Sequence, residues 1–236
     1  MGIGFEQLAW EHTPQGLLTL RRRREPTRDV DVYEVKLDDE YLMSSLFTVA
    51  EEELARLGLA AVDGQDLHVV VGGLGLGYTA VAALEDARVA RLDVVEFQPQ
   101  VIDWHERRLL PDVVVLADDD RVHLVEGDVF AMARGDDGFV PDAPGTQVDA
   151  LLLDVDHSPR HHLHDSHADL YTVDGLRRLA RHLRPDGVFA LWSDDPPDDA
   201  FVADLEAVFA TVEAHVVTFP NFLTGGESAN TVYVAR

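Results

Sequence analysis

The sequence predicts an α/β protein in which a doubly wound, mostly parallel sheet follows a small antiparallel β unit. From residue 67 onward, short apolar runs alternate with segments of helical periodicity, as in sheets covered by helices on both faces. The apolar run 68–71 leads into a glycine-rich turn, Gly72–Gly77. Residues 1–45 show strand-like runs instead. We therefore expect a β unit over residues 1–45 and an α/β domain over residues 46–236.

The N-terminal unit is predicted from β-branched and alternating apolar residues. Strand-like runs occupy Gly16–Leu20 and Val30–Val35, separated by the polar turn Arg24–Arg28. A second turn, Asp38–Glu40, precedes another short apolar run. The basic run Arg21–Arg24 has two interpretations, a phosphate-binding patch or a solvated strand end that balances acidic neighbours. The second is favoured.

The α/β domain begins with a helix on the spacing of Leu46, Val49, Ala50, Leu54 and Leu57, closed by Gly58 and Asp63-Gly64. Glycine and proline mark most of the later boundaries. The remaining elements are expected as strand 67–72, helix 78–86, strand 92–96, a helix started by Pro99 and stopped by Pro111, strand 122–125, a surface loop 135–147, strand 148–154, a helix with Val173, Leu176, Ala180 and Leu183 on one face, strand 187–192, a helix with Phe201, Leu205, Val208 and Phe209 on one side, and closing strands 212–219 and 229–235.

Composition excludes several classes of function. With 19 Lys and Arg against 44 Asp and Glu, the formal net charge of −25 repels nucleic acids and anionic membranes. The absence of cysteine excludes disulfides, thiolate metal sites and cysteine nucleophiles. No apolar run reaches membrane-spanning length, and the N-terminal residues show no export signal, so a cytoplasmic location is expected.

The glycine turn is the first candidate binding site. Gly72, Gly73, Gly75 and Gly77 permit a tight turn and a close backbone approach to a ligand, and the helix that follows offers free N–H groups. Such a run also occurs in ordinary strand–helix turns. Glu96 ends the next strand about 20 residues later, which is the usual spacing of an acid that binds ribose hydroxyls. Together they predict a nucleoside site.

Acids or glycines follow four successive strands of the predicted sheet. Ligands of open parallel sheets bind beyond the carboxyl ends of the strands, and those ends carry Gly72–Gly77, Glu96, Asp128, Asp154 and Ser193–Asp195. Asp128 has two interpretations that are compatible with each other. It can accept a hydrogen bond from the exocyclic amine of adenine, or it can cap the helix that begins at Val129.

These motifs, taken together, resemble the spermidine synthase-like branch of the class I S-adenosylmethionine-dependent methyltransferase superfamily. The resemblance implies a Rossmann-like fold with a seven-stranded sheet and a donor that is S-adenosylmethionine or its decarboxylated form. It also implies a homodimer, and cofactor-binding roles for Gly72, Gly73, Gly75, Gly77, Glu96, Asp128, Val129 and Asp154. The matching residues are Gly72–Gly77, Val94–Glu96, Glu126–Phe130, Asp149–Asp154, Leu183–Gly187, Phe219–Phe222 with Gly225-Gly226 and Val232–Val234, and Leu42–Ser45 in the N-terminal unit.

Two departures from the family pattern bear on the acceptor. Aminopropyltransferases of this branch carry Asp-Ser-Ser/Thr-Asp-Pro after the fourth strand, and the second Asp is implied as the base. Here Asp154 matches the first acid and His157 stands at the second, while Phe222 replaces a substrate-contacting tyrosine. A histidine can act as a general base at neutral pH. We therefore predict His157 as the base, with Asp154 and Asp156 as the other catalytic residues.

A loop rich in histidine follows Asp154. Five of the 11 histidines lie in it, at positions 157, 161, 162, 164 and 167, beside Asp156 and Asp165. Imidazole and carboxylate groups can bind a divalent metal, but the spacing matches no tight ligand motif, and a flexible polar lid is favoured. A magnesium site on Asp154, Asp194 and Asp195, as in catechol-type O-methyltransferases, is a further option that is less favoured than plain loop residues.

The leading hypothesis is methyl transfer from S-adenosylmethionine to a nitrogen or oxygen nucleophile of a small molecule. The donor sulfonium is already activated, so the protein needs to align the two substrates and remove a proton. The alternatives are an aminopropyltransferase that uses decarboxylated S-adenosylmethionine and a non-catalytic nucleoside-binding protein. An NAD-dependent dehydrogenase fits less well, because nothing in the chain resembles a hydride-transfer site.

Overall fold

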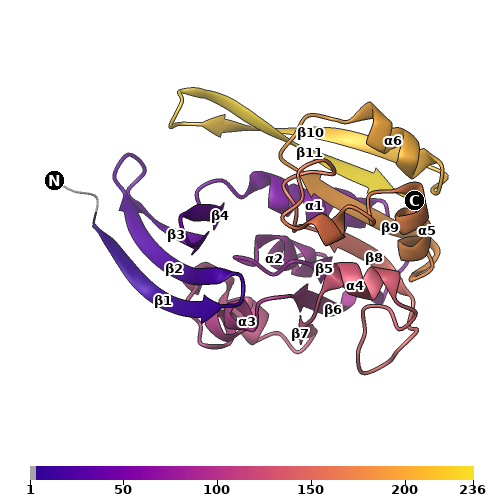
Figure 1. The fold of residues 1–236 in the computed structure, drawn as a ribbon, viewed down its shortest axis with the longest axis horizontal. Coiled ribbons are helices and arrows are strands. Elements are labelled where there is room, and N and C mark those ends of the chain that lie inside the picture. Colours follow the sequence, from indigo (N-terminus) through magenta and orange to yellow (C-terminus); the bar gives the residue numbers. More distant parts are fainter. Residues whose placement is uncertain (1–3) are drawn as a thin grey trace.

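The N-terminal unit is a four-stranded antiparallel sheet. The computed structural model describes residues 4–236, so residues 1–3 of the predicted unit lie outside the described part. The strands lie in the order β1 (Phe5–Thr13), β2 (Gly16–Glu25), β3 (Val30–Leu37) and β4 (Glu40–Ser44) (Figure 1). Strand β1 was missed in the sequence because Ala9 is its one buried residue, so it has no apolar alternation.

The basic run of strand β2 forms ion pairs within this sheet. Arg21 and Arg23 both bind the buried carboxylate of Glu34, with Nε–O distances of 2.6 Å and 2.8 Å. Arg22 and Arg24, on the other face, pair with acidic residues of strands β1 and β3 and of the β2–β3 turn. The run therefore balances acidic neighbours, as the favoured interpretation held.

Helix α1 (Val49–Ala60) connects the two units and lies close against the main sheet. The prediction that Gly58 closes this helix was wrong, because Gly58 lies within it. A Cβ atom at Gly58 would be 2.6 Å from Cδ2 of Leu152 and 3.1 Å from Cβ of Ala190. Glycine is required here by the close approach of the helix to the sheet, and it does not act as a terminator.

The main sheet has seven strands in the order β10-β11-β9-β8-β5-β6-β7. Strands β5 to β9 pair in parallel, while β11 pairs antiparallel with both β9 and β10. The predicted doubly wound, mostly parallel seven-stranded sheet is thereby confirmed. The strands are β5 (Leu67–Gly72), β6 (Val89–Glu96), β7 (Val122–Glu126), β8 (Val148–Leu153), β9 (Leu183–Ser193), β10 (Val212–Asn221) and β11 (Gly226–Ala235).

Six α-helices and two short 3-10 helices are found in the described part of the chain. After α1 they are α2 (Tyr78–Leu84), α3 (Pro99–Glu106), η1 (Pro111–Ala117), α4 (Val129–Arg134), η2 (Asp165–His167), α5 (Val173–Ala180) and α6 (Asp199–Glu206).

Several boundaries differ from the prediction. Helix α3 ends at Glu106, before Arg108 adopts a positive φ of 57°, and Pro111 begins η1 instead of stopping α3. Leu183 starts strand β9, so it does not belong to the α5 face. Strands β10 and β11 pair as far as Asn221 and Gly226, which shortens the predicted loop to residues 222–225. The long hairpin extends along the top of Figure 1, in yellow.

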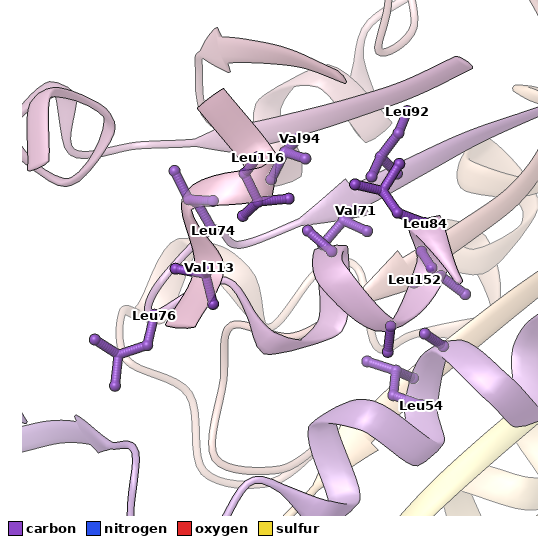
Figure 2. Close-up of a cluster of buried hydrophobic side chains, with 14 of the residues drawn as sticks. Leu54, Val71, Leu74, Leu76, Leu84, Leu92, Val94, Val113, Leu116 and Leu152 are labelled. Atoms are coloured by element: carbon purple, nitrogen blue, oxygen red, sulfur yellow. The ribbon is translucent and has the colours of Figure 1, made fainter. Parts of the chain in front are cut away.

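The two faces of the sheet bury separate apolar layers. Alternation in β5 places Val69 and Val71 in one layer and Val70 in the other. Helices α1, α2 and α3 cover the first layer, and α4, α5 and α6 cover the second. Figure 2 shows part of the first layer, where Leu54 of α1 and Val113 and Leu116 of η1 belong to one buried cluster with strand residues. No helix within residues 4–236 is long and apolar enough to span a membrane.

Candidate active site

The glycine turn between β5 and α2 has the strained backbone that its sequence suggested. Gly73, Gly75 and Gly77 have φ angles of 96°, 48° and 91°, in the region that favours glycine. A Cβ atom at Gly73 would lie 2.1 Å from the main-chain oxygen of Asp154. One at Gly75 would meet the sulfur of Met43, from β4, at 2.7 Å. The turn is therefore enclosed by the end of β8 and by the N-terminal unit.

Glu96, at the end of β6, is joined to this turn through the backbone. Its Oε2 accepts hydrogen bonds from the N–H groups of Leu74 (3.0 Å) and Gly75 (3.4 Å), and its Oε1 accepts one from Gln98 (2.8 Å). Burial raises the pKa of Glu96, and these backbone donors oppose the rise. The structure thus brings together the predicted acid and the predicted turn. Phe97, the next residue, leaves its ring 54% exposed beside them.

His105 of α3 packs against the same turn. Sequence reasoning did not identify this residue. The residue is buried, and burial lowers the pKa of its ring, so the imidazole is neutral at pH 7. Its Nε2–H donates to the main-chain oxygen of Gly75 at 2.9 Å. A Cβ atom at Gly77 would lie 2.9 Å from Cε1 of this ring. The small residue and the histidine fit together and fix the shape of the turn.

Asp128 and Val129 lie at the junction between the end of β7 and the start of α4. The Oδ1 atom of Asp128 accepts hydrogen bonds from the N–H groups of Phe130 (2.9 Å) and Ala131 (3.0 Å), so the predicted helix cap is present. Asp128 is half-buried, and Val129 is buried against Gly72. Both therefore lie at the same edge of the sheet as the glycine turn, where the prediction placed them.

Asp154 follows β8 and is joined to the glycine-turn helix by one hydroxyl group. Thr79 Oγ1, in the first turn of α2, donates to Oδ2 of Asp154 at 2.7 Å and lies 3.2 Å from the main-chain oxygen of Glu51. Burial raises the pKa of Asp154 to about 6, opposed by the Thr79 hydrogen bond. Burial also raises the pKa of Glu51 to about 8, helped by the neighbouring charge of Asp154. Thr79 thus links three elements.

A cavity of about 400 Å³ opens beside this link. Two carboxylates line it, Glu51 from α1 and Asp194 after β9. Asp194 Oδ1 accepts a hydrogen bond from Asn230 Nδ2 at 2.7 Å. The walls are partly aromatic, and the lining is completed by Ser44, Phe47, Trp192, Phe219, Ser228, Ala229 and Asn230. An acidic cavity with aromatic walls suits a small organic cation.

The N-terminal unit and the C-terminal hairpin meet next to this cavity. Phe47 packs against Phe219 and Phe222, with ring centroids 5.6 Å and 5.4 Å apart. The guanidinium of Arg28, from the β2–β3 turn, lies 4.7 Å from the centroid of the Phe222 ring. Phe222 stands where relatives of the resembled family have a tyrosine, and here it packs between these two groups.

Asp156 is 1% exposed and organises its own loop. Its Oδ1 accepts hydrogen bonds from Leu163 N–H and His167 Nδ1, and its Oδ2 accepts one from the hydroxyl of Tyr171, each at 2.8 Å. Neither Asp154 nor Asp156 is among the residues that line the cavity. The contacts of Asp156 are those of a positioning residue, and a catalytic role for it stays a prediction.

The histidines of the 157–167 loop also have separate local partners. His161 pairs with Asp195, and His167 stacks on Phe130 with centroids 3.7 Å apart. His162 stacks on Tyr171, and His164 hydrogen-bonds Ser166. Across residues 4–236, no group of three or more His, Asp or Glu side chains is arranged to hold a metal ion.

His157 is half-buried and is held through its main chain, whose oxygen accepts a hydrogen bond from Asp194 N–H at 2.7 Å. The residue thus lies beside an acid that lines the cavity. Its assignment as the base stays a prediction.

Besides His105, the sequence did not single out Glu51, Thr79 and Asn230. Glu51 lies off the apolar face of its helix, and such a residue is usually solvated. Thr79 is one polar residue in an alanine-rich helix, and Asn230 lies in the middle of a strand. No local motif marks them, because the fold brings them together from distant parts of the chain.

Comparisons with known proteins bear on the fold and on the family resemblance. No protein-family model matches the chain. Putrescine N-methyltransferase 2 of Nicotiana tabacum is 26% identical over 182 residues, which cover 74% of this chain and 47% of that protein. The chain therefore spans about half the length of this relative.

Two solved structures share the fold. Spermidine synthase from Thermotoga maritima matches with a TM-score of 0.72 and 17% identity, over 97% of this chain and 72% of that one. Human methyltransferase-like protein 13 in complex with SAH matches with a TM-score of 0.57 and 19% identity, over 79% of this chain and 82% of that one. The resemblance predicted from the sequence is confirmed: this chain has the fold of the spermidine synthase-like class I methyltransferases.

Proposed function

We propose that the protein transfers a methyl group from S-adenosylmethionine to an amine of a small molecule. The observation that carries this proposal is the acidic, partly aromatic cavity beside the glycine turn, joined to it by the Thr79 hydroxyl. An amine acceptor is a cation at neutral pH, so it suits two carboxylates better than a neutral alcohol does. The similarity to a putrescine N-methyltransferase supports the same acceptor class.

The donor would lie at the ends of strands β5 to β8. In this proposal the glycines of the turn, Gly72, Gly73, Gly75 and Gly77, give its backbone close access. Glu96 binds the ribose hydroxyls, Asp128 and Val129 border the adenine, and Asp154 borders the sulfonium end. The donor supplies an activated carbon at sulfur, and the protein holds the amine nitrogen in line with it.

Aminopropyl transfer from decarboxylated S-adenosylmethionine is the second candidate. The fold match to a spermidine synthase over 97% of this chain favours it. Against it, His157 stands where the resembled aminopropyltransferases carry their second acid. Methyl transfer is therefore preferred.

A product assay with both donors separates these two functions. The purified protein is incubated with putrescine and either S-adenosylmethionine or its decarboxylated form, and products are identified by mass spectrometry. We expect N-methylputrescine with the first donor and no spermidine with the second. Spermidine as the main product would reverse the preference, and binding of SAH without turnover on a panel of amines would leave only nucleoside binding.

Two further proposals concern the cellular location and the oligomeric state of the protein. We propose a cytoplasmic location, which the sequence predicts, and a homodimer, which the family resemblance implies. Sedimentation analysis of the purified protein at micromolar concentration tests the dimer, and a single species of 26.1 kDa would contradict it.

A further inference from the structure

The acids of helix α1 differ in their partners. Glu52 and Glu53 both pair with Arg56, at distances of 3.1 Å. Glu51 lines the cavity, and no basic side chain pairs with it among residues 4–236. Asp194 also lines the cavity, and within that range it too lacks a basic partner. The two carboxylates that face the cavity are thus the ones without a cation.

The walls of the cavity are partly aromatic. Trp192 lines the cavity, while its indole nitrogen is buried away from solvent. The rings of Phe47 and Phe219 line the same cavity and can pack against a carbon chain.

The position of Glu51 relative to the donor site follows from two hydrogen-bond distances. Thr79 Oγ1 lies 3.2 Å from the main-chain oxygen of Glu51 and 2.7 Å from Oδ2 of Asp154. Asp154 in turn lies against the glycine turn, since its main-chain oxygen is next to Gly73. With the donor placed as proposed above, a molecule in the cavity would contact Glu51 on one side and face the donor sulfonium on the other.

We propose that Glu51 accepts the proton of the acceptor ammonium group and that Asp194 binds this cationic acceptor in the cavity. The inference rests on the proposed methyl transfer, which it deepens. The ammonium N–H proton moves to the carboxylate of Glu51, and the freed nitrogen lone pair attacks the methyl carbon. The C–S bond breaks, and its electron pair stays on sulfur as the neutral thioether. The product amine then carries the positive charge.

The electrostatic surroundings of Glu51 agree with this role. The charged groups that face it are Asp154 after β8, Asp194 after β9 and Glu52 on its own helix. Burial and these like charges raise the pKa of Glu51 to about 8. Such a carboxyl group is a much better proton acceptor for an ammonium than an ordinary glutamate is. A bound cation stabilises its ionised form, so acceptor binding near pH 7.5 should release a proton from Glu51.

The first test measures this proton by calorimetry. Putrescine is titrated into the protein saturated with SAH, at pH 7.5, in buffers of different ionisation enthalpy. The wild type should release a large fraction of one proton per putrescine bound, and Glu51→Gln should release none. Glu53→Gln is the matched control on the same helix and should behave as wild type. Equal proton release from wild type and Glu51→Gln would overturn the assignment.

The second test uses turnover and separates Glu51 from His157. Glu51→Gln should lower kcat for methyl transfer by about 10²-fold, the usual range for loss of a general base, and should change the pH profile. SAH affinity should stay within about twofold of wild type, as expected for a residue on the acceptor side. If His157→Gln loses the turnover while Glu51→Gln keeps it, the inference is wrong although the proposed function stands.

Failure of the proposed function itself has a different signature. The wild type would then bind SAH but neither bind putrescine in the calorimeter nor methylate it, and the inference would fall with it. Urea unfolding of each variant provides the folding control. Asp194→Asn should raise the KM for the amine about tenfold and leave SAH binding unchanged, and an unchanged KM would remove Asp194 from the assignment.

Discussion

The proposed donor side and the proposed acceptor side of the candidate site differ in the groups that surround their carboxylates. On the donor side, Glu96 is buried, and backbone N–H groups of the glycine turn and of Gln98 satisfy both of its oxygens. On the acceptor side, Glu51 is half-buried and faces other acids, and no basic side chain of residues 4–236 pairs with it. Both carboxyl groups have raised pKa values. The backbone around Glu96 therefore holds its carboxylate in place, whereas a bound cation would be needed to neutralise Glu51.

Gly73→Ala should have the largest effect on stability and on SAH binding, because the proposed donor side depends on the backbone conformation of the glycine turn. The new Cβ would meet the main-chain oxygen of Asp154 at 2.1 Å, on a φ of 96°. We expect a loss of at least about 3 kcal/mol in the free energy of unfolding and no measurable SAH binding. Gly145→Ala is the control, since its φ is 77° but nothing lies within 4 Å. Similar urea midpoints for the two variants would contradict this account.

Glu51→Gln should stabilise the protein at alkaline pH, in contrast to any change at Glu96. The folded-state pKa of Glu51 is about 8, above its ordinary value near 4.5. The folded state thus binds more protons than the unfolded state between these values, and stability falls as pH rises through that window. Removing the carboxylate should add at least about 2 kcal/mol at pH 8.5 and little at pH 4.5. Urea unfolding at both pH values, with Glu53→Gln as control, measures it.

Glu96→Gln should weaken donor binding without affecting the acceptor cavity. One carboxylate oxygen would become an amide that cannot accept from the backbone, so a buried N–H would lose its partner. We expect about 2 kcal/mol of lost SAH affinity, roughly 30-fold. Glu126→Gln, at the exposed end of the adjacent strand, should change it by less than twofold. An unchanged SAH affinity in Glu96→Gln would place the donor elsewhere.

Arg28→Gln should have the smallest effect, and on the acceptor side alone. The variant removes the guanidinium that lies over the Phe222 ring beside the cavity. An exposed cation–π contact contributes about 0.5–1 kcal/mol. We expect the KM for the amine to rise about threefold with SAH affinity unchanged. Steady-state kinetics together with SAH titration measures both, and a change confined to SAH affinity would be inconsistent with the position of Arg28.

The contrast between the two sides also explains what the sequence could predict. The glycine turn, Glu96 and Asp128 lie at fixed offsets from strands with clear apolar periodicity, so the sheet and their common position at one edge of it were predictable. Glu51, Thr79 and Asn230 come from three separate elements, and only the folded chain places them together. Strand β1 was missed for a different reason. Ala9 is the one residue that it buries, so its sequence shows no apolar alternation.

The prediction for the histidine-rich loop shows a further limit of composition. Its histidines look like a set in the sequence, yet in the fold His161, His162 and His167 have different partners. Asp156 hydrogen-bonds His167 and Tyr171 within this loop. Residues that are close in sequence can point in different directions once the loop turns, because the direction of each side chain depends on the local backbone.

The glycine within helix α1 has a consequence for redesign. Gly58 leaves no space for a side chain between the helix and Leu152, so the depth of α1 on the sheet is fixed. The volume available to an acceptor therefore depends on the lengths of side chains on the first turn of this helix and on the opposite wall. Shortening Glu51 to aspartate would enlarge the cavity without moving its frame. If the cavity binds the proposed acceptor, the size of amine that it accepts can thus be altered one methylene group at a time.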